Sequence, residues 1–420
     1  MSGGGTASPN PPQPVVIPEG DDMVGLLIYA LENGISDVHL TPGYPPMIRI
    51  HGTMAPTTRP ILDRDTLHNL LYDMLTDDQR KRLERDKELD FALQLGDKGR
   101  FRVNCFFNMK GEGAVFRNIP SKILSFEDLN SPPILKAVAH KPRGMVLVTG
   151  PTGSGKSTTL AAMVDYINSN FDKHILTIED PIEFVHHPKR GIVNQRELGS
   201  NTKSFANALK SALREDPDVI LIGEMRDLET ISLALTASET GHLVFGTMHT
   251  QSAPKTCDRL LDVFPANQQG LVRMMFSESF QAICCQTLIP KKDGTGRVCA
   301  MEILIGTSAA RALIREGKTH QLPTVIQTGA KYGMQSLDQN LKDFVMRGVI
   351  SEAAALERAN NPEFIVRGGE DMLEQSSVGG APSAGQRAGG MGGGTAAAGG
   401  RGAGVSKGAA MPTMDTMGRR

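Results

Sequence analysis

The strongest chemical signal in the sequence is the segment GPTGSGKST at residues 150–158. It follows the apolar run Met145–Thr149 and precedes a predicted helix, so it matches the pattern G-x-x-x-x-G-K-[ST] in the context that this pattern requires. Gly150, Gly153 and Gly155 let the backbone bend until consecutive N–H groups converge on phosphate oxygens. The positive end of the following helix adds to that field. The segment therefore predicts a site for a nucleoside triphosphate.

Two side chains of this loop have separate tasks. Lys156 supplies a mobile positive charge for the β- and γ-phosphates, and Ser157 supplies a hydroxyl oxygen to Mg²⁺. All nine residues are candidate nucleotide-binding residues: Gly150, Pro151, Thr152, Gly153, Ser154, Gly155, Lys156, Ser157 and Thr158.

Hydrolysis of the nucleotide also needs carboxylates that orient water and manage Mg²⁺. TIEDPIEF, at residues 177–184, contains Glu179 next to Asp180, and VILIGEMRD, at residues 219–227, contains Glu224. Both segments follow apolar runs, and ligands of parallel sheets bind at the carboxyl ends of strands. Gly223 stands where an Asp commonly coordinates magnesium, so Glu224 acts largely alone or the metal depends on Glu179 or Asp180. We expect the metal ligands to be Ser157, Glu179 and Glu224.

A histidine completes this set of candidates. In GHLVFGTMHT, at residues 241–250, the apolar run Leu243–Phe245 would deliver His249 beyond the carboxyl end of a strand, near the γ-phosphate. His242 lies at the other end of that strand.

The elements that position these residues form an α/β domain. Four short, continuously apolar runs, Met145–Thr149, Ile175–Ile178, Val219–Ile222 and Leu243–Phe245, are typical of parallel strands that are covered on both faces. Helical segments are predicted beyond them, from Asn267 through Leu288, over Ser308–Glu316 and over Ser336–Arg347.

A smaller α+β domain precedes it. A helix over Met23–Asn33 ends at Gly34, and a charged amphipathic helix covers Leu67–Arg85. The predicted strands are Asp37–Leu40, Pro46–His51, a strand around Phe91, Arg100–Phe107 and Gly113–Ile119.

The composition sets the limits of the domains and excludes some functions. We expect a disordered extension at 1–20, the small domain at 21–124, a Pro-rich linker at 125–142, the ATPase domain at 143–366 and a disordered Gly/Ala-rich tail at 367–420.

The chain has 45 Lys and Arg, 46 Asp and Glu and no Trp, which argues against a nucleic-acid-binding protein. Five cysteines without a CxxC pair indicate a reducing compartment. Without a signal peptide or a long apolar stretch, we expect a soluble cytoplasmic chain.

Four segments carry a resemblance to a known family. GPTGSGKST, TIEDPIEF, ALREDPDVILIGEMRD and GHLVFGTMHT are similar, in order and spacing, to the Walker A, Asp-box, Walker B and His-box motifs of the type II/IV secretion ATPases. LIREGKTHQ and YGMQSLDQNL resemble the pilus-retraction branch of that family. The resemblance covers about residues 21–364.

This resemblance implies a PAS-like N-terminal domain and a RecA-like P-loop ATPase domain, assembled as a homohexameric ring. It implies that Glu224 is the catalytic glutamate, that Glu179 lies near the metal or water and that His249 senses the γ-phosphate. Three further arginines match ones that reach the nucleotide from the N-terminal domain: Arg100, Arg102 and Arg117.

The function that the resemblance implies is a Mg²⁺-dependent ATPase that powers type IV pilus retraction. It would dock at the inner face of the cytoplasmic membrane on an inner-membrane pilus platform protein, work beside other pilus ATPases, and neither span the membrane nor bind nucleic acid. The alternatives are a pilus-assembly or type II secretion ATPase and an accessory retraction paralogue. From other classes of protein, the alternatives are a scaffold that binds ATP but barely hydrolyses it and a RecA-like DNA-strand protein. The helix AARALIRE departs from the family motif AIRNLIRE at Ala310 and Ala312.

Overall fold

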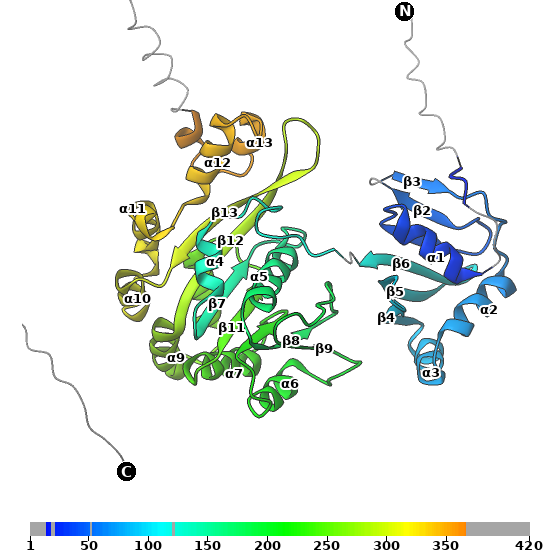
Figure 1. Ribbon diagram of the computed structural model, residues 1–420, viewed down its shortest axis with the longest axis horizontal. Coiled ribbons are helices and arrows are strands. Elements are labelled where there is room, and N and C mark those ends of the chain that lie inside the picture. Colours follow the sequence, from blue (N-terminus) through cyan, green and yellow to red (C-terminus); the bar gives the residue numbers. More distant parts are fainter. Residues whose placement is uncertain (1–13, 18–21, 51–52, 120–121, 367–420) are drawn as a thin grey trace, which may run out of the picture. The chain divides into compact units, whose positions relative to one another are not determined.

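The computed structural model describes residues 14–17, 22–50, 53–119 and 122–366 (Figure 1). Within these ranges the strands form two sheets, one of six strands and one of seven. Each sheet falls inside one of the two predicted domains, and each has its own apolar core. The expected α/β fold class is confirmed, while the domain boundaries stay predictions. The tail at 367–420 lies outside the described residues.

The six-stranded sheet is antiparallel, in the order β3-β2-β1-β6-β5-β4. Its helices contribute to one buried apolar cluster that includes Leu27, Leu67 and Phe101. The elements are α1 Met23–Glu32, β1 Asp37–Leu40, β2 Met47–Ile50, β3 Thr53–Pro56, α2 Arg64–Met74, α3 Asp77–Asp86, β4 Glu88–Leu95, β5 Gly99–Asn108 and β6 Gly111–Ile119.

The expected first helix and its end are confirmed. The Asp22 carboxylate accepts the backbone N–H of Gly25, which caps α1, and Gly34 has φ +67°. This left-handed conformation strains any residue with a Cβ atom, so glycine suits the position after the helix.

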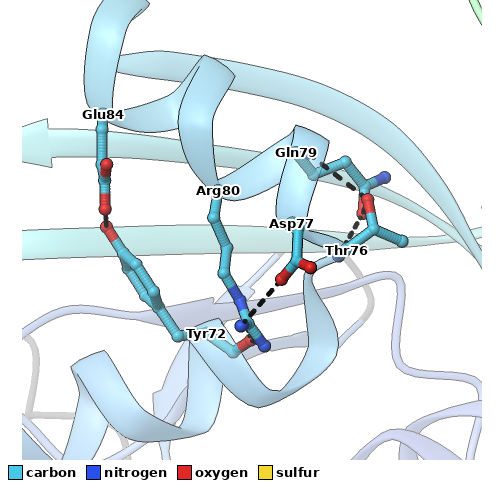
Figure 2. Close-up of polar contacts among 6 residues, drawn as sticks. All are labelled: Tyr72, Thr76, Asp77, Gln79, Arg80 and Glu84. Atoms are coloured by element: carbon cyan, nitrogen blue, oxygen red, sulfur yellow. Dashed lines mark hydrogen bonds and ion pairs between the residues drawn. The ribbon is translucent and has the colours of Figure 1, made fainter.

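The expectation of one helix over Leu67–Arg85 is wrong, because two helices, α2 and α3, meet at residues 75–76. Thr76 caps α3, since its hydroxyl accepts the N–H of Gln79 while the Gln79 side chain accepts the N–H of Thr76. Arg80 donates to the carbonyl oxygen of Tyr72, at the end of α2, from two nitrogens at 3.0 and 2.7 Å. Figure 2 shows this corner, with Asp77 against Arg80 and Glu84 against the Tyr72 hydroxyl. The capping box starts a new helix, although the amphipathic pattern continues across it.

The expected disorder of residues 1–20 is wrong for residues 14–17. Val15 pairs with Thr57: its N–H donates to Pro56 O at 2.8 Å, and its carbonyl accepts the N–H of Thr58 at 3.1 Å. The remainder of this extension lies outside the described residues.

The seven-stranded sheet has the order β13-β12-β7-β11-β10-β8-β9, and every neighbouring pair is parallel except β12 with β13. Helices cover both faces, so buried clusters lie on each side of the apolar central strands. Its elements include α4 Ile134–Ala139, β7 Gly144–Thr149, α5 Lys156–Asn170, β8 His174–Glu179, β9 Ile192–Glu197, α6 Phe205–Ala212, β10 Val219–Ile222, α7 Leu228–Glu239, β11 Leu243–Met248, α8 Ala253–Asp262 and α9 Ala266–Ser279.

The C-terminal part of this sheet differs from the expectation of a helix from Asn267 through Leu288. Helix α9 ends at Ser279, and Phe280 begins a long strand that pairs with β7 on one side and β13 on the other. Pairing on both sides inside the sheet outweighs a sequence pattern that suits either structure. The elements from this point are β12 Phe280–Pro290, β13 Arg297–Ile305, α10 Ser308–Arg315, α11 Leu322–Thr328, α12 Leu337–Met346 and α13 Glu352–Leu356, with single 3₁₀ turns at Thr319–Gln321 and Ala330–Tyr332.

The expected linker at 125–142 also contains structure. Helix α4 lies within it and buries Leu135, Val138 and Ala139 in the cluster beneath α5. Across the described ranges, no helix is both long enough and apolar enough to cross a membrane.

One buried histidine gives the stability of this part a pH dependence. His186 is 7% exposed, and burial lowers its pKa from the ordinary 6.5 to about 4. The unfolded chain therefore binds more protons between these two values, and stability falls as the pH drops through this window.

We expect the wild-type protein to lose about 2 kcal/mol more of unfolding free energy than His186→Gln between about pH 7 and pH 5. Urea unfolding of both proteins at the two pH values measures this difference. Equal losses would show that His186 is not buried in its neutral form.

Candidate active site

The phosphate loop lies between β7 and α5, as the sequence predicts. Gly150, Gly153 and Gly155 have φ of +143°, +77° and +87°. A Cβ atom at Gly150 would lie 2.3 Å from the carbonyl oxygen of Gln286, so glycine is required there for space as well as for conformation. No side chain caps the N-terminus of α5, which leaves its first N–H groups available to an anion.

A cavity of about 710 Å³ opens over this loop. It brings together residues of the loop and the three predicted catalytic groups that follow β8, β10 and β11. The lining includes Thr152, Gly153, Gly155, Lys156, Ser157, Thr158, Glu179, Asp180, Glu183, Glu224, Arg226 and His249.

Lys156 is bonded to its own loop. Its ammonium group donates to the carbonyl oxygens of Gly150 at 2.9 Å and Pro151 at 3.1 Å. Burial lowers the pKa of Lys156, while the charges of Glu224 and Glu183 act in the opposite direction. A phosphate would replace neutral carbonyl acceptors with charged ones, which form stronger hydrogen bonds with an ammonium group.

The loop has a second support that sequence reasoning missed. Gln286 donates from its side-chain amide to the carbonyl oxygen of Ser154 at 2.8 Å, from β12 beneath the loop. The sequence pattern predicts a helix at Gln286, and no local signal marks its role, because the pairing of β12 with β7 and β13 places it there.

Glu179 ends β8 and is held by two neighbours. Its Oε1 accepts the hydroxyl of Thr177 at 2.7 Å and the amide of Gln195 at 3.2 Å. Burial raises the pKa of Glu179, against the effect of these hydrogen bonds. A Cβ atom at Gly223 would lie 3.2 Å from the Cα of Glu179, so a side chain there would be tight against the end of the neighbouring strand β8.

Glu224 follows β10 and lies at the centre of a charged group. Its carboxylate forms an ion pair with both Arg226 Nε and Nη2, and His249 Nε2 lies 3.0 Å from its Oε1. The backbone beside it is fixed, since the N–H of Met225 donates to Thr247 O at 3.0 Å. His249 comes directly after β11, as predicted. Arg226 was missed, and its only sequence signal is its place two residues after Glu224.

The three predicted arginines share one face of the first sheet but have different surroundings. Arg100 donates to Glu197 at 2.6 Å, and Arg117 donates to Asp37 at 2.8 Å. Burial alone would raise the pKa of Asp37, but its bonds with Arg117 and Ser36 lower it. The side chain of Arg102 makes no hydrogen bond or ion pair with any residue that the structure describes.

The expected magnesium ligands can be tested against this geometry. Ser157, Glu179 and Glu224 line the same cavity and present oxygen atoms, the donors that Mg²⁺ prefers. Among the described residues, no group of three His, Cys, Asp or Glu side chains is arranged to hold a metal by itself. The donor set therefore fits an ion that is held largely by nucleotide phosphates and waters, with one or two protein ligands.

The comparisons with known proteins agree with this chemistry. The family model described as type II/IV secretion system protein matches residues 23–361. The type IV pilus retraction ATPase PilT of Pseudomonas aeruginosa is 57% identical over 342 residues, which are 81% of this chain and 99% of PilT. A twitching motility protein of Neisseria gonorrhoeae is 56% identical over 318 residues, 76% of this chain and 85% of that protein. A crystal structure of the pilus retraction motor PilT with bound ADP matches with a TM-score of 0.78 at 45% identity, over 82% of this chain and 99% of that one.

We expect Glu224→Gln to bind ATP but to hydrolyse it more slowly by about 10²-fold or more, because an amide cannot accept a proton from the attacking water. Phosphate release and binding of a fluorescent nucleotide measure the two properties separately. The matched control is Glu229→Gln, an exposed glutamate of α7 that pairs with Lys210. Hydrolysis by Glu224→Gln at the rate of this control would remove Glu224 from the reaction.

Proposed function

The chain belongs to the type II/IV secretion system protein family and is an ATPase, and on this basis we propose that it is the motor that retracts type IV pili. The observation that carries the proposal is the likeness to PilT over nearly the whole of that protein, in a chain with a complete site. The phosphate loop, two carboxylates and His249 all face one cavity.

The residues that line the cavity have different proposed roles in ATP hydrolysis. The N–H groups of the loop and Lys156 bind the phosphates, and Glu224 orients the attacking water and accepts its proton. His249, whose Nε2 lies 3.0 Å from Glu224 Oε1, senses the γ-phosphate. Glu179 supports the metal or the water. Ser157, Glu179 and Glu224 are the residues that would hold Mg²⁺, which would supply positive charge against the phosphates.

The motor is proposed to work as a ring of six identical subunits in the cytoplasm. It docks on a pilus platform protein at the inner face of the cytoplasmic membrane, and ATP hydrolysis deforms the ring so that pilin subunits leave the base of the pilus. An accessory retraction ATPase and a pilus-assembly ATPase are the alternatives, and piliation of a deletion strain separates them.

We expect deletion of the gene to give cells with abundant surface pili and no twitching motility. Wild-type protein and Glu229→Gln should restore motility, whereas Glu224→Gln should not. Electron microscopy of pili and measurement of colony spreading record both traits. Cells without pili would instead support an assembly motor, and unchanged twitching would support an accessory role.

Arg102 allows us to test whether neighbouring subunits of the proposed ring share active sites. Because Arg100 and Arg117 already have partners within the chain, Arg102 is the arginine best placed to complete a neighbouring subunit's site. Charge from such an arginine would stabilise the transferring phosphoryl group.

We expect Arg102→Ala and Glu224→Gln proteins to be nearly inactive alone and to recover ATPase activity when mixed. Some interfaces of a mixed ring join an intact Glu224 to an intact Arg102, and these interfaces hydrolyse ATP. Fluorescence energy transfer between labelled subunits first establishes exchange, and Arg85→Ala, an exposed arginine beside Asp86, is the control. No recovery at any ratio, with exchange shown, would place Arg102 outside shared sites.

A further inference from the structure

Arg226 forms an ion pair with the Glu224 carboxylate, the group that is proposed to act on the attacking water. Its guanidinium group bonds to both oxygens of Glu224, and Oε1 also has His249 Nε2 at 3.0 Å. A carboxylate has about four acceptor positions, and the guanidinium group and His249 take three of those of Glu224. In this arrangement Glu224 is in place, but its capacity to orient a water and accept its proton is reduced.

The two partners of this ion pair differ in how firmly they are held. The Glu224 side chain is 21% exposed, and its backbone is fixed on both sides, because Met225 donates to Thr247 and the Thr247 hydroxyl donates to Gly223 O. The Arg226 side chain is 75% exposed. Among the described residues its only hydrogen-bond partner is Glu224. Arg226 can therefore turn away without disturbing the fold, whereas Glu224 cannot.

A second cation that lines the cavity, Lys156, also bonds to acceptors of the protein, the carbonyl oxygens of its own loop. A triphosphate that enters this cavity offers both cations more highly charged acceptors than a single carboxylate or a backbone carbonyl. The γ-phosphate is the group that comes closest to Glu224, so it competes for the nearer cation, Arg226.

We propose that Arg226 is a latch on Glu224 that the γ-phosphate opens. Without a γ-phosphate, the guanidinium group holds the Glu224 carboxylate. When ATP binds, Arg226 turns to the γ-phosphate oxygens and frees Glu224 to act on water. ADP has no γ-phosphate and leaves the latch closed. The inference rests on the proposed role of Glu224, but its test measures nucleotide binding and is independent of that role.

A double-mutant cycle between Arg226 and Glu224 tests the latch. Dissociation constants for ADP and for the non-hydrolysable analogue AMP-PNP are measured by calorimetry for the wild type, Arg226→Ala, Glu224→Gln and the double variant. The control is Arg190→Ala, an exposed arginine that pairs with Asp172. Circular dichroism and thermal melting confirm that every variant is folded.

The latch predicts a specific pattern of affinities. Arg226→Ala should weaken AMP-PNP binding by about tenfold and leave ADP binding unchanged within about twofold, since a charge-assisted bond to the γ-phosphate is lost. Glu224→Gln should bind AMP-PNP more tightly than the wild type, because its uncharged amide competes less for Arg226. In that background, Arg226→Ala should cost more affinity than it does in the wild type.

Steady-state kinetics supply a second readout. Arg226→Ala should raise KM for ATP more than it lowers kcat, because Glu224 stays free in the bound state. Arg226→Lys keeps the charge without the bidentate geometry and should recover part of the preference for AMP-PNP over ADP.

Three results would overturn the latch. Equal losses of ADP and AMP-PNP affinity in Arg226→Ala would indicate a structural role. A loss of kcat with unchanged affinities would indicate that Arg226 positions Glu224 during the reaction. Strictly additive effects in the cycle would show that Glu224 and the γ-phosphate do not compete for Arg226. If Glu224→Gln still hydrolyses ATP, the proposed role of Glu224 fails while the binding cycle keeps its meaning.

Discussion

The parallel pairing of β7, β11, β10 and β8 is the constraint on which the candidate site depends. The register places Thr149 beside Met248 and Ile222 beside Gly246, so these strands end close to the same edge of the sheet. The phosphate loop, His249, Glu224 and Glu179 lie at or just beyond those ends. Because the strands are buried on both faces by helices, polar chemistry has room only at this edge.

A second property of the site is that its charged groups already have hydrogen-bond partners within the protein. Lys156 bonds to loop carbonyls, Arg226 and His249 hold Glu224, and Glu179 accepts bonds from the polar side chains around it. A nucleotide therefore exchanges hydrogen bonds with the protein rather than filling an unstructured cavity. Under the latch that we propose, this exchange would distinguish ATP from ADP, since only ATP carries a γ-phosphate that could take Arg226 from Glu224.

Sequence reasoning succeeded where the structural cause is local. The glycines of the phosphate loop, the end of α1 at Gly34 and the apolar strands β8 and β10 were found because backbone conformation and burial leave a direct mark on residue type. Sequence reasoning failed where contacts with a segment distant in the chain determine the local structure. The chain from Phe280 became a strand because β7 and β13 pair with it, and the apolar residues there suit a helix as well. The break between α2 and α3 was visible as Thr76 and Gln79, but the longer amphipathic pattern concealed it.

The sequence by itself predicted a nucleoside triphosphate site, the loop residues expected to bind the phosphates, and the carboxylates and histidine at the ends of the strands. These properties come from short motifs whose backbone geometry is nearly independent of the surrounding fold. Only the tertiary structure decided that Gln286 supports the loop, that a side chain at Gly223 would press on Glu179 and that Arg100 and Arg117 are already paired. These contacts depend on where strands distant in sequence come to lie. The structure also decided that Arg226 pairs with Glu224, two residues away, because the sequence does not show in which direction an exposed arginine side chain turns.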